Sequence, residues 1–137
     1  MSEPGQDPVV LIVDDSDDDR FFFRVALKKA GVAARLFSAE DGEEAIQFLS
    51  HTGRFSNAAE SPSPDYIFLD LKMPGRNGFE VLEWIKGQPA PISCPVLILS
   101  GSHEPADMQR SRELGAADYI IKPITPKKLR EVLFTQG

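Results

Sequence analysis

Apolar residues along this chain follow two alternating patterns. Short β-prone segments with little polar alternation are separated by longer stretches in which apolar residues recur every three or four positions. The clearest short segment, Asp65-Tyr66-Ile67-Phe68-Leu69-Asp70, is apolar through its centre, which is typical of a strand buried on both faces of a parallel sheet. From this pattern we expect five strands, at residues 9–13, 35–38, 65–70, 96–99 and 117–121.

The stretches between the strands have helical periodicity and helix boundary signals. Gly31 and Gly115 stand where a helix is expected to end. Pro105 and Pro126 stand in first turns, where the missing amide proton costs nothing, and Thr125 is a suitable N-cap. We expect five helices, at residues 17–30, 40–49, 79–86, 105–114 and 126–134.

Alternating strands and helices predict a single α/β domain. The expected architecture is a doubly wound parallel sheet with helices on both faces and right-handed crossovers. A length of 137 residues suits one such domain. Residues 1–8 contain Gly and Pro and are predicted to be a flexible N-terminus, and residues 51–64, rich in Ser, Pro and Gly, a long surface loop inserted within the domain. We expect no second domain.

Three consecutive phenylalanines begin the first expected helix. Helical spacing predicts a core face, to which we assign the following residues: Phe22, Phe23, Ala26, Leu27 and Ala30. Phe21 and Val25 extend this apolar stripe sideways, although three consecutive side chains cannot all face one core. We interpret the segment as a wide buried face, with a patch for a partner protein as the alternative.

Composition excludes several classes of protein. The net charge of −6 argues against a nucleic acid or an anionic membrane as partner, because both need a basic surface. The lone Cys94 excludes an internal disulfide and a cysteine zinc cluster, and we expect it to be a small buried side chain. The chain has no apolar run of transmembrane length and no signal peptide. We therefore expect a soluble cytoplasmic protein.

Polar side chains stand where four of the expected strands end. Asp14 and Asp15 follow the first strand, Asp70 ends the third, Ser100 follows the fourth and Lys122 the fifth. The carboxyl ends of parallel strands share one edge of the sheet. Three carboxylates, a hydroxyl and an ammonium are therefore predicted to converge there.

Three clustered carboxylates repel one another, and a hard divalent cation such as Mg²⁺ removes that cost. One carboxylate could then act as a nucleophile toward a phosphoryl donor and form an aspartyl phosphate. Lys122 would supply positive charge and Ser100 a hydroxyl. We interpret Asp17, Asp18 and Asp19 as compensation of the helix dipole and leave them outside the site.

At these residues the chain resembles the receiver domain of two-component response regulators, from Val9 to about Thr135. The resemblance is carried by a set of motifs: Asp14-Asp15, Asp70 followed by Met73-Pro74 and Gly78, Ser100-Gly101, and Lys122-Pro123. It implies a flavodoxin-like fold with strand order 2-1-3-4-5, and a cis peptide bond at Lys122-Pro123.

The resemblance also implies a role for each site residue. Asp70 would be the phosphoacceptor, and Asp14, Asp15 and Asp70 would hold Mg²⁺ with the backbone carbonyl of Lys72. Ser100 would move to bind the phosphoryl group, and Lys122 would pair with it. Tyr119 matches the aromatic switch position. By the same resemblance, Lys72 and Ser102 flank the phosphate and tune its hydrolysis.

The expected partners follow from the same resemblance. About fifteen residues follow Lys122, so we expect a stand-alone receiver that lacks an output domain. The loop after Asp70 is similar to that of single-domain receivers paired with bacterial phytochromes and other sensor histidine kinases. The readout would be a contact with a downstream protein, with a homodimer as a further possibility.

Three alternatives stay open in the sequence. An aspartyl phosphatase would need a second acid near the nucleophile, where this chain has Lys72. A pseudo-receiver that only binds partners should lack one of the acids or the lysine. A dinucleotide-binding domain should have a glycine-rich loop after the first strand, where this chain has Asp-Asp-Ser.

Overall fold

The computed structural model describes residues 7–57, 62–89 and 92–134. The predicted flexible N-terminus, residues 1–8, lies mostly outside the described residues, as do residues 58–61 of the predicted loop. The strands are β1 Val9–Val13, β2 Arg35–Ala39, β3 Tyr66–Leu69, β4 Val96–Ser100 and β5 Asp118–Ile121. The helices are α1 Asp17–Ala30, α2 Gly42–Ser50, η1 Gly53–Phe55 (a 3₁₀ turn), α3 Gly78–Lys86, α4 Pro105–Glu113 and α5 Pro126–Phe134.

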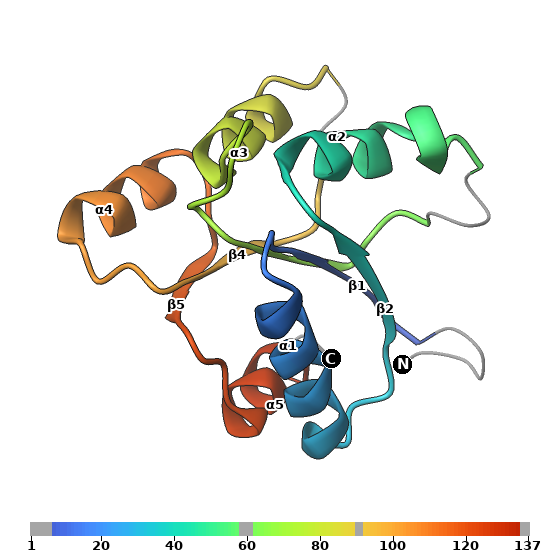
Figure 1. Cartoon of the computed structure of the whole chain (residues 1–137), viewed down its shortest axis with the longest axis vertical. Coiled ribbons are helices and arrows are strands. Elements are labelled where there is room, and N and C mark those ends of the chain that lie inside the picture. Colours follow the sequence, from blue (N-terminus) through green and yellow to red (C-terminus); the bar gives the residue numbers. More distant parts are fainter. Residues whose placement is uncertain (1–6, 58–61, 90–91, 135–137) are drawn as a thin grey trace.

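The five strands form one parallel sheet in the order β2-β1-β3-β4-β5, as the resemblance implied. Helices α1 and α5 lie on one face of the sheet and α2, α3 and α4 on the other (Figure 1). Val13 pairs with Leu69, and Leu69 with Ile98. The carboxyl ends of the central strands therefore lie at one edge, which is where the candidate site residues were expected.

The core has two layers, one on each side of the sheet. Val10, Ile12 and Phe68 face α1 and α5, whereas Leu11 and Ile67 face α2 and α3. Side chains alternate between the faces along each strand, and both faces are covered. The apolar runs that predicted buried strands are explained by this double covering.

The helix ends follow the predicted signals with small shifts: α2 runs over Gly42–Ser50 and not 40–49, α3 begins at Gly78 and not 79, and α4 ends at Glu113 and not 114. Ser16 caps α1 by accepting a hydrogen bond from the amide of Asp19 at 3.2 Å, and Gly31 ends the helix at φ +70°. Helix α2 begins at Gly42 and not at residue 40, because Asp41 is the N-cap and accepts from the amide of Glu44 at 2.8 Å. The predicted start overlooked that capping signal.

The predicted wide buried face of α1 is wrong. Phe23 is 1% exposed, but Phe21 is 54% and Phe22 is 57% exposed. Successive helical residues point about 100° apart, so only one of three can face the sheet. The remaining assigned residues, Ala26, Leu27 and Ala30, are buried as expected.

Two smaller expectations also changed. The predicted loop at residues 51–64 contains the η1 turn, where the Phe55 ring packs on Phe48 with centroids 5.2 Å apart. Cys94 is only partly buried, against the α2 and α3 face of the core. Within the described residues, every helix is too short or too polar to cross a membrane.

Candidate functional site

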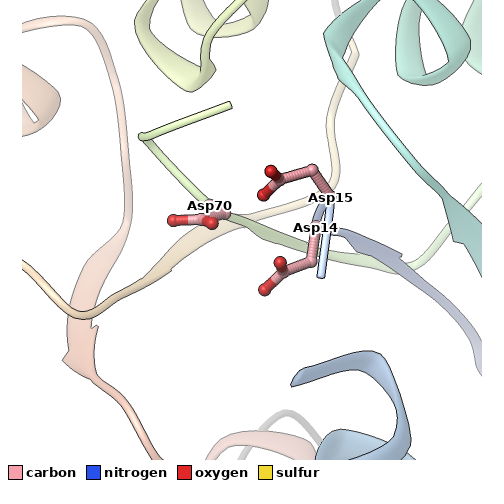
Figure 2. Close-up of side chains that lie close together, drawn as sticks. All are labelled: Asp14, Asp15 and Asp70. Carbon is pink, nitrogen blue, oxygen red and sulfur yellow. The ribbon is translucent and has the colours of Figure 1, made fainter. Parts of the chain in front are cut away.

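Asp14, Asp15 and Asp70 gather at the carboxyl edge of the sheet. Each offers a carboxylate oxygen, and these oxygens lie within 4.8 Å of one another. Figure 2 shows the three side chains at the ends of β1 and β3. Asp14 is 1% and Asp70 5% exposed, whereas Asp15 is open to solvent. The structure therefore brings together the three acids that the strand ends predicted.

The backbone around Asp70 holds it rigidly at the end of β3. The amide of Asp70 donates to the carbonyl of Val13 on β1 at 2.9 Å. After Asp70 the chain folds back so tightly that a Cβ at Gly78 would lie 2.3 Å from the carbonyl oxygen of Asp70. Only glycine fits this close approach, which gives Gly78 of the predicted motif a structural reason.

Lys122 supplies the positive charge of the site. Its Nζ lies 2.7 Å from Asp14 Oδ2, 2.7 Å from Asp19 Oδ2 and 3.2 Å from Asp70 Oδ2. The lysine is set at the end of β5, where its amide donates to the carbonyl of Ser100 at 2.9 Å. The following Lys122-Pro123 peptide bond is cis, as the resemblance implied.

Burial and charge act against each other in this cluster. Burial raises the pKa of Asp70 above its ordinary value and Asp14 adds to the rise, while Lys122 opposes it. Burial also works against the charge of Lys122, but its contacts with Asp14 and Asp19 hold its pKa above the ordinary value. Lys122 therefore remains charged and partly offsets the repulsion between the carboxylates.

The donor set fits a hard divalent cation. Asp14 Oδ1 accepts from the amide of Ser16 at 3.0 Å. Asp14 Oδ2 is buried beside Lys122 but receives no hydrogen bond of good geometry, so it stays available as a ligand. Carboxylate oxygens in this number are the donors that Mg²⁺ and similar ions prefer. The role of the Lys72 carbonyl as a further ligand stays a prediction.

Asp19 is a site residue that the sequence analysis left out. It lies in the first turn of α1, as expected for helix-dipole compensation, yet its carboxylate reaches Lys122. Its neighbours Asp17 and Asp18 are exposed. The interpretation of all three acids as dipole compensation is therefore incomplete for Asp19.

Ser100 and Tyr119, the predicted switch pair, both contact the β4–α4 loop at Ser102. Ser100 is fully buried, and its Oγ accepts from the amide of Ser102 at 3.2 Å. The Tyr119 hydroxyl donates to the carbonyl of Ser102 at 3.0 Å. A movement of Ser100 would therefore displace Ser102, to which the Tyr119 hydroxyl is hydrogen-bonded.

A second charged contact lies beside the site. Lys72 Nζ is 3.3 Å from Asp107 Oδ2, an oxygen that also accepts from the Ser102 hydroxyl at 2.6 Å. The hydrogen bond from Ser102 and the charge of Lys72 lower the pKa of Asp107. Asp107 comes from the first turn of α4, and no strand end pointed to it in the sequence.

Comparison with known proteins gives one consistent family. The model of the response regulator receiver domain matches residues 10–134. The response regulator Rcp1 of Synechocystis sp. is 36% identical over 130 residues, covering 94% of this chain and 86% of that protein. The chain spans between 26% and 53% of the length of several other curated relatives.

Solved structures agree with the sequence matches. The crystal structure of the Mn²⁺-bound form of Rcp1 is similar at 35% identity and a TM-score of 0.76, covering 92% of this chain and 88% of that one. The phosphorylated cyanobacterial phytochrome response regulator RcpA is similar at 29% identity and a TM-score of 0.82, covering 96% of each chain.

Proposed function

The chain belongs to the response regulator receiver family, whose members are phosphoacceptors of two-component systems, and from that premise we propose the chemistry of its own residues. Asp70 accepts a phosphoryl group from the phosphohistidine of a sensor histidine kinase, with Mg²⁺ bound at the site. The observation that carries this proposal is the pairing of buried Asp70 with both Lys122 and two further carboxylates at one sheet edge.

Receiver domains hold a divalent cation at an acidic cluster, and here Asp14, Asp15 and Asp70 are the proposed side-chain ligands with the Lys72 carbonyl. Bound Mg²⁺ would neutralise carboxylate repulsion and polarise the phosphoryl oxygens. We propose Mg²⁺ because these hard oxygen donors suit it and because it accompanies phosphoryl groups in cells. The donor set alone also suits Mn²⁺.

The transfer step needs only the groups that the site holds. A carboxylate oxygen of Asp70 attacks phosphorus as the phosphorus–nitrogen bond to the kinase histidine breaks. The nitrogen keeps the bonding electron pair and the imidazole leaves. The new acyl phosphate carries negative oxygens, which Lys122 offsets from its place beside Asp70. Loss of the phosphoryl group to water then regenerates Asp70, so both steps are proposed to be promoted by the chain itself.

The proposed switch runs from Ser100 to Tyr119. The phosphoryl oxygens attract the Ser100 hydroxyl, and its movement shifts Ser102 because the Ser102 amide is hydrogen-bonded to Ser100. Tyr119 follows because its hydroxyl is bonded to the Ser102 carbonyl. The surface of α4, β5 and α5 is then biased toward a second arrangement.

The proposed partners are a sensor histidine kinase, of the phytochrome type by likeness to RcpA, and a downstream protein read by the α4, β5 and α5 surface. A homodimer through that surface is a further proposal. We propose that the phosphoryl transfer takes place in the cytoplasm, where the kinase domain would present its phosphohistidine.

Mass spectrometry after incubation with a small-molecule phosphodonor tests the proposal. We expect one added phosphoryl group in the presence of Mg²⁺ and none in EDTA or in Asp70→Asn. Asp65→Asn is a matched control at the opposite end of β3, and it should label normally once folding is confirmed. Full labelling of Asp70→Asn would overturn the assignment, and turnover of a phosphomonoester would instead favour the aspartyl phosphatase.

A further inference from the structure

Ser102 is tied to its surroundings by every polar atom it has. Its amide donates to Ser100 Oγ at 3.2 Å, and its carbonyl accepts from the Tyr119 hydroxyl at 3.0 Å. Its own hydroxyl donates to Asp107 Oδ2 at 2.6 Å and accepts from the amide of Glu104 at 3.2 Å. The residue therefore links the switch serine, the switch tyrosine and the start of α4.

Lys72, in the loop after β3, makes a parallel set of contacts. Its amide lies 3.4 Å from Asp70 Oδ1 as a weak hydrogen bond, and its ammonium is 3.3 Å from Asp107 Oδ2. Lys72 follows Asp70 by two residues, and Ser102 follows Ser100 by two. The loops after β3 and β4 therefore make matching contacts. In each loop a backbone amide binds an oxygen of the site, on Asp70 or Ser100, and the side chain of the same residue binds Asp107 Oδ2.

We propose that Asp107 is a positioning residue that holds the Lys72 ammonium and the Ser102 hydroxyl together and so ties the first turn of α4 to the phosphoacceptor. The proposal rests on the proposed function, because it assigns Asp107 an effect on the phosphoryl group of Asp70. Neither the strand ends nor the receiver motifs quoted above include this residue.

Competition for donors is the physical basis. A phosphoryl group on Asp70 presents several anionic oxygens, whereas Asp107 offers one carboxylate that already takes two donors. If the Lys72 ammonium and the Ser102 hydroxyl moved from Asp107 to the phosphoryl group, the first turn of α4 would lose both contacts. That helix is weakly held within the described structure, since Ser111 is its one buried residue. Asp107 would thereby couple phosphorylation to the position of α4.

The same competition sets the lifetime of the phosphoryl group. In hydrolysis, a water oxygen attacks phosphorus, the bond between phosphorus and the Asp70 oxygen breaks, and the carboxylate is regenerated as inorganic phosphate leaves. While Asp107 holds Lys72 and Ser102, these side chains leave the phosphoryl oxygens open to water. Freed from Asp107, they would bind those oxygens and hinder the attack.

A purely structural role makes a different prediction. An acid in the first turn of a helix interacts favourably with the helix dipole, and the Ser102 hydroxyl adds hydrogen bonds to Asp107 and to the amide of Glu104. If Asp107 only stabilised α4 in this way, its loss would lower the free energy of unfolding and leave the chemistry at Asp70 unchanged. The lifetime of the acyl phosphate separates the two roles.

The experiment follows the decay of phosphorylated protein by intact mass after the donor is removed, with Mg²⁺ present. We expect the hydrolysis rate constant of Asp107→Asn to fall by about threefold or more, the change that an ion pair of ordinary strength gives. Glu113→Gln removes one exposed negative charge from the same helix, and it should decay like the wild-type chain.

A double-mutant comparison makes the result specific. In a Lys72→Ala, Ser102→Ala background, Asp107→Asn should have no further effect on decay, because its two donors are gone. Equal decay of wild type and Asp107→Asn would overturn the inference, as would the same fold-change in both backgrounds. Failure of the wild type to label at Asp70 would instead overturn the proposed function, and this inference with it.

Discussion

The ammonium of Lys122 lies 2.7 Å from the carboxylate of Asp19, although 103 positions separate the two residues. Asp19 is the third residue of α1, and its side chain is 36% exposed, far more than the other partners of Lys122. Asp14 and Asp70 are buried and fixed by the ends of their strands. Asp19 is therefore the partner that Lys122 can exchange most easily when the charge on Asp70 changes.

Replacement of Asp19 by Asn should lower the free energy of unfolding by about 0.5–1 kcal/mol, the range for a partly exposed ion pair. Asp18→Asn is the matched control, because it removes a charge from the same helix turn at an exposed position. Urea unfolding monitored by circular dichroism measures both. Equal losses would mean that the helix dipole, and not Lys122, accounts for the effect.

Lys122→Met should destabilise the chain in EDTA by about 3–5 kcal/mol, because Asp14 and Asp70 would stay buried without a positive charge. Millimolar Mg²⁺ should restore most of this loss, since a cation bound only to the folded state stabilises it. Lys128→Met removes a partly exposed lysine that pairs with Asp118 at 3.3 Å, and it should cost far less. A loss that Mg²⁺ leaves unchanged would contradict this account.

The phenylalanines of α1 should differ sharply in their contribution to stability. Phe23→Ala should cost about 3–5 kcal/mol, because the ring is buried 4.9 Å from that of Phe68. Phe22→Ala should cost less than about 1 kcal/mol, because most of its ring is already in water. Guanidinium unfolding of both variants tests the difference. A large loss of unfolding free energy in Phe22→Ala would instead support the interpretation of α1 as a wide buried face.

The strands were predictable because the signal for each one lies within its own few residues. A strand covered on both faces needs an unbroken apolar run, and β1 and β3 have one. The face of α1 was predicted less well because Phe22 is apolar but off the buried stripe. The spacing of Phe23, Ala26, Leu27 and Ala30 follows the i, i+3, i+4, i+7 rule, and strict use of it would have excluded Phe22.

Only the site residues that stand at the ends of strands were predictable from the sequence. Asp14, Asp70 and Lys122 follow strands directly, so sheet topology brings them together whatever their rotamers. Asp19 and Asp107 enter from first turns of helices, and their contacts depend on helix placement and side-chain direction. A first-turn acid is common for dipole reasons, so the sequence does not distinguish Asp19 from Asp18.

Cys94 should react slowly with alkylating reagents at neutral pH. Burial raises the pKa of its thiol to about 11, so the reactive thiolate is scarce below pH 9. Iodoacetamide labelling at pH 8 should be at least about tenfold slower than in urea-unfolded chain. The difference should shrink as pH rises toward 11, because the folded thiol then ionises. Equal rates at pH 8 would show that the thiol is not shielded.

Asp15 should separate metal binding from folding. Its carboxylate belongs to the acidic cluster but is exposed, so Asp15→Asn removes a ligand and a repulsive charge without opening the core. In EDTA the variant should be as stable as the wild type or slightly more stable.

Addition of Mg²⁺ should then raise the melting temperature of the wild-type chain. The stabilisation approaches about 2.7 kcal/mol at a hundredfold excess over the dissociation constant. Asp15→Asn should lose most of this response, while Asp18→Asn should keep it, because Asp18 lies outside the cluster. Sodium chloride at matched ionic strength controls for screening of the negative chain. An undiminished Mg²⁺ response in Asp15→Asn would remove Asp15 from the site and leave the cation to the two buried carboxylates.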